Sequence, residues 1–134
     1  MNEHKTSRET GDIGEEIAVE FLKSHGYGII ARNYYASHAE IDVIAITPDG
    51  EAIVFCEVKS RSEKVAEKYG RPANAVGYTK QRHLIFAANQ YIRKNPDICS
   101  SRRVRIDVIE VYLPVRGLPK VRHLQNAVSV RSEH

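Results

Sequence analysis

The chain is predicted to form one α/β domain in which helices flank a mixed central β-sheet. Its 134 residues suit a single domain, which can bury roughly two-thirds of its unfolded surface without disulfides or a structural metal. Apolar residues recur at helical spacing in two segments and alternate, or run without interruption, in others. The resulting order is helix, three strands, helix, strand, strand, which is typical of a mixed-sheet α/β domain.

The first predicted element is an amphipathic helix over residues 9–25, which Gly26 ends because glycine readily takes a positive φ. Its apolar stripe is formed by Ile13, Ile17, Ala18, Phe21 and Leu22. Successive helical residues are turned by about 100°, which puts Glu16 opposite the stripe and Glu15 and Glu20 at its two edges. Either Glu15 or Glu20 could reach inward over the sheet, and the periodicity does not choose between them.

Three strands are predicted next. Residues 27–32 form the first, and residues 33–39 are a loop or a strand edge. Residues 40–46 (EIDVIAI) and 52–59 (AIVFCEVK) flank a Pro-Asp-Gly turn, so they are expected to pair as a β-hairpin. The second of these runs is apolar on both faces until Glu57, which is typical of a central strand covered on both sides.

The remaining elements follow a long charged connection over residues 60–79, and connections of this length are usually functional or disordered. A second helix is expected over residues 80–94, with Thr79 as its N-cap and Asn95-Pro96 at its end. The last two strands are expected at residues 104–112 (VRIDVIEVY) and 121–124. Two acids in the first of these strands, Asp107 and Glu110, are unusual among apolar neighbours, and Asp107 could anchor a buried network.

The chain has no apolar run long enough to span a membrane and no signal-peptide pattern at its start. Two cysteines do not make a disulfide scaffold, and Cys56, on an apolar strand face, is expected to be a small buried hydrophobe. We therefore expect a cytoplasmic protein without membrane contact. Residues 1–9 are predicted to be a flexible arm, 10–125 the folded domain and 126–134 a tail.

The net charge of +3 hides a strong asymmetry along the chain. Residues 1–58 carry a net charge of −7, residues 59–105 a net charge of +9, and residues 106–134 a net charge of +1. One interpretation is an acidic cluster that holds cations beside a basic surface that holds a polyanion. The other is an ordinary distribution of solvated charged faces.

A candidate site follows from the alternation of side chains along a strand. Glu57 and Lys59 share one face of their strand, Glu40 and Asp42 share a face of the preceding strand, and the hairpin brings Asp42 across from Glu57. Carboxylates are suitable ligands for Mg²⁺, and a nearby lysine can hold a water molecule or offset charge on a phosphate. The group therefore suits phosphodiester hydrolysis, although Glu-x-Lys alone is often a solvated strand end.

The chain resembles the YraN-type family of small bacterial proteins, in the PD-(D/E)XK nuclease superfamily. The resemblance spans about residues 11–125. It is carried by Gly14-Glu15-x-x-Ala18 with Leu22 and Gly26-Tyr27, by Arg32-Asn33-Tyr34, by Glu40 to Ala45, by Val54 to Arg61, by Gly70-x-Pro72, by Lys80 and by Asp107-Val108. Two positions depart from the pattern: Ala39 stands where the family usually has glycine, and Ile41 stands where the superfamily has proline.

The resemblance implies a restriction-endonuclease-like αβββαβ core and a metal-dependent nuclease. Archaeal Holliday junction resolvases are similar, and their helix glutamate stands in the same register before a Gly-aromatic pair as Glu15 does, which favours Glu15 over Glu20. Glu15, Asp42 and Glu57 would then bind Mg²⁺ or Mn²⁺, and Lys59 would position the attacking water. By the same analogy the substrate is DNA, with branched or junction DNA as a candidate, and the protein is a homodimer.

Basic residues near the proposed site are expected to bind DNA phosphates. These residues are Arg61, Lys64, Lys68, Arg71 and Lys80; a solvated loop is the simpler alternative for those in the long connection. Two other functions remain open. One is a nucleic-acid-binding protein that keeps the nuclease fold without cutting. The other is an adaptor whose basic segment binds an acidic protein.

Overall fold

A five-stranded mixed sheet with helices on both faces confirms the predicted fold class. The computed structural model describes residues 7–62 and 76–129, with residues 7–9 described by their backbone alone. Its elements are α1 (Ser7–Ser24), β1 (Gly28–Ala36), β2 (Ala39–Ile46), β3 (Ala52–Ser62), α3 (Tyr78–Lys94), α4 (Pro96–Cys99), β4 (Arg103–Leu113) and β5 (Lys120–Val128).

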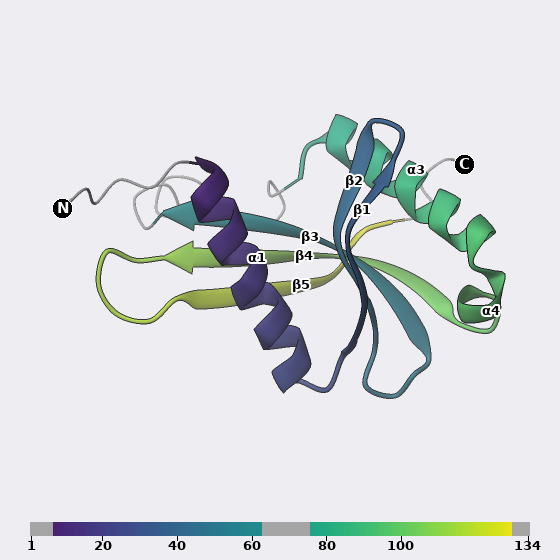
Figure 1. The fold of residues 1–134 in the computed structure, drawn as a ribbon, viewed down its shortest axis with the longest axis horizontal. Helices are drawn as coiled ribbons and strands as arrows, with labels where there is room; N and C mark the ends of the chain where they lie inside the picture. Colours follow the sequence, from purple (N-terminus) through teal and green to yellow (C-terminus); the bar gives the residue numbers. More distant parts are fainter. Residues whose placement is uncertain (1–6, 63–75, 130–134) are drawn as a thin grey trace.

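The strands are ordered β1-β2-β3-β4-β5 across the sheet (Figure 1). Neighbouring strands are antiparallel except for β3 and β4, which run parallel and pair from Ala52↔Arg103 to Ser62↔Leu113. A parallel pair needs a crossover connection, and here that connection includes α3 and α4. The carboxyl ends of β3 and β4 therefore lie side by side at the same end of the sheet. The prediction that residues 52–59 form a central strand is confirmed.

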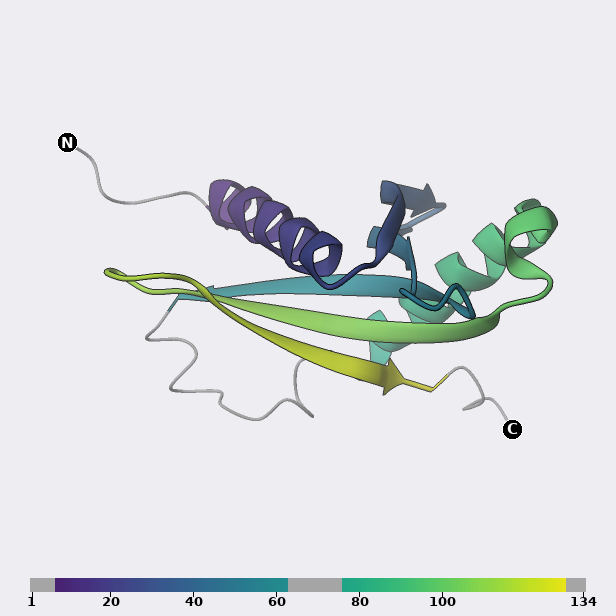
Figure 2. The same cartoon turned by 90° about the horizontal axis from the view of Figure 1, so that it is seen from below.

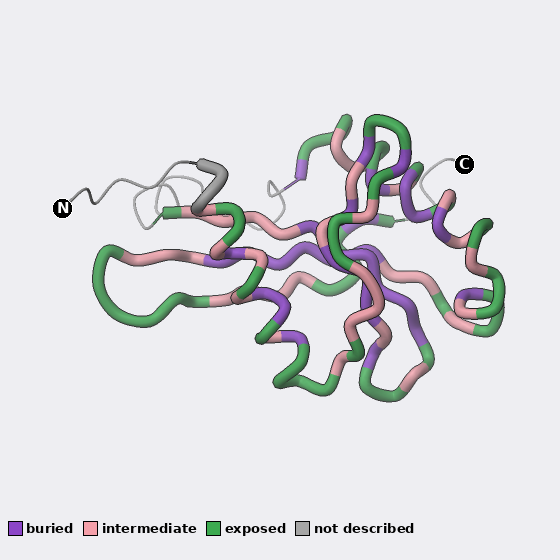
Figure 3. The backbone as a smooth tube through the Cα atoms, in the orientation of Figure 1, coloured by how far each residue is buried: buried purple, intermediate pink, exposed green. Residues whose placement is uncertain are grey.

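The two faces of the sheet bury two separate apolar clusters. Figure 2 shows α1 lying along one side, where Ala18, Val19 and Leu22 pack against Val43, Val54, Cys56, Ile109 and Val111. On the other side Leu84, Ala87, Ala88 and Tyr91 of α3 pack against Ile41, Ile44, Ile53, Phe55, Ile106 and Val108. Burial is concentrated along the central strands (Figure 3). Fully burying each large aliphatic or aromatic side chain stabilises the fold by roughly 1.5–3 kcal/mol.

The central strand β3 shows how this alternation reaches the candidate site. Its even-numbered residues, such as Val54 and Cys56, belong to the α1 cluster, whereas Ile53 and Phe55 belong to the α3 cluster. Cys56 is fully buried and free, as expected. Glu57 continues the row of side chains that faces α3, so on this face of β3 a carboxylate is the next side chain after the buried Phe55.

Several local predictions can be compared with the structure. The hairpin turn is confirmed, with Gly50 at φ 76° and its N–H donating to the Thr47 carbonyl at 2.8 Å. The N-cap prediction for Thr79 is wrong, because α3 begins at Tyr78 after Gly77, which makes no side-chain cap. The short helix α4 was not anticipated.

The outer strands are longer than the sequence indicates. The ambiguous segment 33–39 belongs to β1 as far as Ala36. Strand β5 covers the predicted residues 121–124 and continues to Val128, beyond residue 125, where the domain was expected to end. Among the described residues, no helix is both long and apolar enough to cross a membrane.

Candidate active site

Asp42 lies where the β2–β3 hairpin opens. The paired register runs from Ile46↔Ile53 to Val43↔Cys56 and stops there. The next residue, Asp42, accepts a hydrogen bond through its Oδ2 from the backbone N–H of Val58 at 2.7 Å. A side-chain carboxylate thus takes the place of a strand carbonyl at the fork, which brings it beside Glu57.

Glu57 is a buried carboxylate, only 4% exposed, with an incomplete set of partners. Its Oε2 lies 3.4 Å from Nζ of Lys59 and 3.6 Å from Nζ of Lys80. Its Oε1 is buried and has no hydrogen-bond partner among the described residues. A buried oxygen without a partner costs free energy. Glu57 therefore offers one free oxygen beside two lysines, one of them from α3.

The electrostatic coupling between Asp42 and Glu57 is the strongest sign of a functional site. Burial and the nearby charge of Glu57 raise the pKa of Asp42 to about 7, even though the hydrogen bond from Val58 acts in the opposite direction. Asp42 therefore keeps its proton to a higher pH than an ordinary aspartate does. Adjacent carboxylates in a partly desolvated place repel each other until a proton or a cation is bound.

Glu15 approaches the same region because α1 packs unusually close to β3. Gly14 permits this approach: a Cβ at that position would lie 1.7 Å from Oγ of Ser60. Glu15 is partly buried, and its Oε1 lies 3.5 Å from Nη2 of Arg32. Burial raises the pKa of Glu15, and Arg32 partly offsets that rise. The charge of Glu15 also contributes to the raised pKa of Asp42.

The three glutamates of the first helix have different surroundings. Glu16 is exposed, as predicted, and lies 3.0 Å from Nη1 of Arg32. Glu20 is also exposed and lies 4.0 Å from Nζ of Lys23. Of the two residues that periodicity left open, Glu15 is thus the one on the side of Asp42.

The carboxylates do not all converge at one point. Within residues 10–62 and 76–129, no three His, Cys, Asp or Glu side chains form a group that could hold a metal ion. The assembled part is the Asp42–Glu57 pair, while Glu15 is held by Arg32. Two oxygen-donor residues are nevertheless a suitable partial ligand set for Mg²⁺, which is bound through one or two carboxylates and keeps several waters.

The predicted phosphate-binding residues can be placed only in part. Lys80, at the start of α3, contacts Glu57. Arg61 lies on β3 two residues beyond Lys59, with its Nε 3.8 Å from Oε2 of Glu110. Lys64, Lys68 and Arg71 lie outside the described residues.

Glu110 is a site neighbour to which the sequence assigned no role. It pairs with Lys59 across β3 and β4 and is 2% exposed. Its Oε1 accepts a hydrogen bond from the Tyr112 hydroxyl at 2.8 Å and lies 3.8 Å from Nη1 of Arg122. The sequence did offer one sign of a role for Glu110, because it is an acid at an inward-facing position of a strand with alternating apolar residues. Its partner Arg122 belongs to β5, and the local sequence does not predict that contact.

Asp107 anchors the buried network that its sequence position suggested. Its carboxylate accepts two hydrogen bonds from Arg105, both at 2.9 Å, and one from the Asn126 N–H at 2.8 Å. Nε2 of His123 lies 2.7 Å from Oδ2 of Asp107. Burial would raise the pKa of Asp107, but these partners outweigh it and hold the pKa below its usual value.

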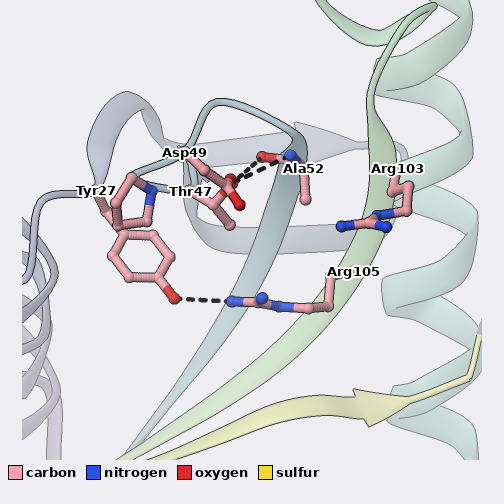
Figure 4. A pocket seen from close by; sticks show the side chains of 7 residues that line it. Tyr27, Thr47, Asp49, Ala52, Arg103 and Arg105 are labelled. Carbon is pink, nitrogen blue, oxygen red and sulfur yellow. Dashed lines mark hydrogen bonds between the residues drawn. The ribbon is translucent and has the colours of Figure 1, made fainter.

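A pocket of about 270 Å³ lies beside this network. It is lined by Tyr27, Thr47, Pro48, Asp49, Ala52, Arg103 and Arg105. Figure 4 shows the Arg105 guanidinium donating to the Tyr27 hydroxyl, at 2.8 Å. The pocket includes the start of β4 and the 47–52 turn, so it lies at the opposite end of the central strands from Lys59.

The fold and this site define a small α/β domain with a coupled carboxylate pair and two lysines at the end of a central strand. The chain belongs to the family described as "Uncharacterised protein family UPF0102", whose model matches residues 14–111. It is 43% identical over 110 residues to a UPF0102 protein of Caldicellulosiruptor saccharolyticus, covering 82% of this chain and 87% of that one.

Other relatives match along nearly their whole length. A UPF0102 protein of Clostridioides difficile is 40% identical over 121 residues, covering 90% of this chain and 97% of its own. One from Mycolicibacterium vanbaalenii is 37% identical over 125 residues, covering 93% and 98%. A solved chain described as Pyrococcus furiosus SfsA in complex with Ca²⁺ is 16% identical with a TM-score of 0.37, covering 89% of this chain and 63% of that one. A similarity at this level carries no functional argument.

Proposed function

We propose that this protein is a metal-dependent DNA endonuclease that hydrolyses phosphodiester bonds. The observation that carries the proposal is the coupling between Asp42 and Glu57, which raises the pKa of Asp42 to about 7. Ionisable groups whose pKa values are strongly perturbed by burial and by a neighbouring charge cluster at functional sites, where they bind or transfer a proton or a cation.

The residues fit a Mg²⁺ or Mn²⁺ ion. Asp42 and Glu57 would hold it through hard oxygen donors. Oε1 of Glu57 has no hydrogen-bond partner among the described residues, which supports this assignment. Glu15 is the further acid that the family resemblance implies, and its charge already acts on Asp42. When bound, the ion supplies Lewis-acid stabilisation of the phosphate and makes an attacking water more acidic.

The lysines have separate roles in this proposal. Lys59 positions the attacking water and offsets charge that develops on the phosphate, which its location 3.4 Å from Glu57 supports. Lys80 and Arg61 bind neighbouring DNA phosphates, together with Lys64, Lys68 and Arg71 from the connection outside the described residues. These contacts supply affinity and position the backbone but carry no sequence information.

The resemblance described above supports the finer assignments. Membership of the PD-(D/E)XK superfamily agrees with the order of elements and with the acid pair on adjacent strands of the hairpin. The likeness to archaeal Holliday junction resolvases makes branched or junction DNA the proposed substrate, and a homodimer would cut two strands symmetrically. Two buried, free cysteines, Cys56 and Cys99, support a reducing cytoplasmic location.

One observation favours a second function, a nucleic-acid-binding protein that does not cut. Oε2 of Glu57 is already flanked by the ammonium groups of Lys59 and Lys80, and the described residues contain no three-ligand metal group. In that case the lysines replace the metal as the neutralising charge. The basic surface would bind DNA, and the acids would only position lysines.

A nicking assay separates the two functions. Linear, flapped and four-way DNA should be incubated with the protein in Mg²⁺, Mn²⁺ or EDTA. We expect metal-dependent nicking that falls on the order of a hundredfold or more in Asp42→Asn, Glu57→Gln and Lys59→Met. Glu20→Gln is the matched control, because Glu20 is an exposed glutamate on α1 that contacts only Lys23 among the ion pairs described. DNA binding without metal-dependent nicking would refute the enzyme and support the binder.

A further inference from the structure

The hairpin between β4 and β5 exposes two large apolar side chains at its tip. β4 ends at Leu113 and β5 begins at Lys120, and between them Val115 is 91% exposed and Leu118 84% exposed. The hairpin projects beyond the end of β3, opposite the turns at the other end of the sheet (Figures 1 and 3). Two such side chains around one turn form a small apolar knob in solvent.

The backbone on either side of this apolar knob is conformationally restricted. Pro114 and Pro119 bracket it, and proline fixes φ and removes a backbone donor. Gly117, at φ 92°, makes the reversal between them. Below the prolines, Leu113 and Val121 pack against the apolar cluster under α1. The tip is therefore presented with little conformational entropy left to lose on binding.

The charged residues of the hairpin itself all have one sign. From Leu113 to Leu124 the chain carries Arg116, Lys120 and Arg122 and no acid. Arg122 is 3.8 Å from the buried carboxylate of Glu110 and lies over the ring of Tyr112, 5.6 Å from its centroid. An apolar tip with cationic flanks complements a nucleic acid, in which a negatively charged backbone encloses stacked bases.

The hairpin and the candidate active site lie toward the same end of the sheet, the end at which β3 and β4 have their carboxyl termini. Because β3 and β4 are parallel, Glu57 pairs with Val108 and Ser62 with Leu113. Five residues of strand span about 17 Å, which corresponds to about five phosphates along one DNA strand. Lys59, Arg61 and Arg122 lie between the two ends, so one duplex could contact the carboxylates and the hairpin together.

We propose that the β4–β5 hairpin recognises a break in base stacking, such as the branch point of a junction. Val115 and Leu118 insert against the unstacked step while Arg116 and Lys120 contact the flanking phosphates. Insertion of apolar wedges costs unstacking energy, and that cost is smallest where the stack is already interrupted. The hairpin thereby selects branched over linear DNA, an inference that rests on DNA being the ligand of the proposed function.

The test uses 2-aminopurine placed at the branch point of a four-way junction, with a linear duplex of the same arm sequence, in EDTA. We expect the wild-type protein to increase the fluorescence of the junction but not that of the duplex. Val115→Ser/Leu118→Ser should lose most of this increase, whereas Val115→Ile/Leu118→Met should retain it. The readout does not depend on cleavage, so a failure to nick DNA leaves it intact.

The cationic flanks need a separate control. Arg116→Gln is expected to reduce the slope of log affinity against log salt by about one. Arg103→Gln, an exposed arginine at the other end of β4, should leave the slope unchanged. An unchanged fluorescence increase in the serine variant, or no junction binding by the wild type, would overturn the inference. Self-association that the serine variant abolishes would instead identify the tip as a contact between copies of the chain.

Discussion

Asp42 and Asp107 are carboxylates of the same sheet with opposite surroundings. Asp107 is fully buried and accepts hydrogen bonds from Arg105 and Asn126, with His123 beside it, so its pKa is held low. Asp42 accepts one backbone hydrogen bond and has Glu57 beside it, so its pKa is raised to about 7. Asp107 is fully buried and Asp42 is partly buried, and burial acts to raise the pKa of both, so the opposite shifts come from their partners.

This difference separates a structural acid from a candidate functional one. Around Asp107 the fold supplies the opposite charge and the donors that a buried carboxylate needs, so nothing further is required for stability. Around Asp42 and Glu57 the fold leaves repulsion between the two acids, although Lys59 and Lys80 contact Oε2 of Glu57, and Oε1 of Glu57 has no hydrogen-bond partner among the described residues. Repulsion of this kind is relieved when a proton or a cation is bound. Four measurements test this distinction, in order of decreasing expected change in stability.

Asp107→Ala should cause the largest loss of stability. It removes the acid from a buried network and leaves Arg105 and His123 without their partner, which costs about 3–5 kcal/mol when a buried pair is broken. Urea unfolding followed by circular dichroism measures the effect. Glu51→Ala, which breaks the exposed pair with Arg103, should cost less than about 1 kcal/mol. Equal losses in the two variants would show that the network is not a structural centre.

Asp42→Asn should stabilise the folded protein, whereas Asp107→Ala should destabilise it. The pKa of Asp42 rises from 3.8 to about 7 on folding. The folded protein thus binds this proton more tightly, and wild-type stability falls as the pH rises between these two values. At pH 8 the neutral asparagine should increase the free energy of unfolding by about 2 kcal/mol. At pH 5, where folded Asp42 is protonated, the gain should shrink.

Unfolding curves at pH 5 and pH 8 check this sign. Asp49→Asn is the matched control, because Asp49 is exposed and its hydrogen bonds to Glu51 and Thr47 lower its pKa. It should therefore give no gain at pH 8. A less stable Asp42→Asn protein at pH 8 would mean that the acid pair carries no strain.

A divalent cation should relieve the repulsion that the asparagine removes. With a dissociation constant of about 1 mM, 10 mM Mg²⁺ would stabilise the wild type by about 1.4 kcal/mol. Calorimetry at pH 8 should show this shift in the wild type and in Asp107→Asn but not in Glu57→Gln. The same shift in all three proteins would place the cation elsewhere and remove the main support for the metal site.

Arg32→Gln should have the smallest effect on stability. It tests whether Arg32 controls the pKa of Glu15 in the candidate site. Arg32 is partly exposed and contacts both Glu15 and Glu16, so its loss should cost less than about 1 kcal/mol. Since burial raises the pKa of Glu15 and Arg32 opposes the rise, the variant should raise that pKa further. A carboxyl titration by NMR measures it, with Arg103→Gln as the control. An unchanged pKa would separate Glu15 from Arg32 and from the site.

The local sequence pattern of the chain was sufficient to predict much of the fold. Helical spacing and strand alternation act between close neighbours, which is why α1, the 47–52 turn and the facing of Glu57 and Lys59 could be predicted. The start of α3 could not, because Thr79 has the right chemistry for a cap but the backbone turns earlier, at Gly77. Helix boundaries depend on the path of the preceding chain as well as on the capping residue.

The local sequence was enough to name the members of the candidate site: an Asp and a Glu on facing strands, a lysine two residues further on, and a glutamate at the edge of the apolar stripe of a helix. Their burial and their charged neighbours depend on long-range packing. The parallel β3–β4 pairing placed Glu110 beside Lys59, α3 brought Lys80 to Glu57, and Arg32 took hold of Glu15. These contacts join residues far apart in sequence, and charge, burial and pKa depend on distances in space that no local pattern specifies.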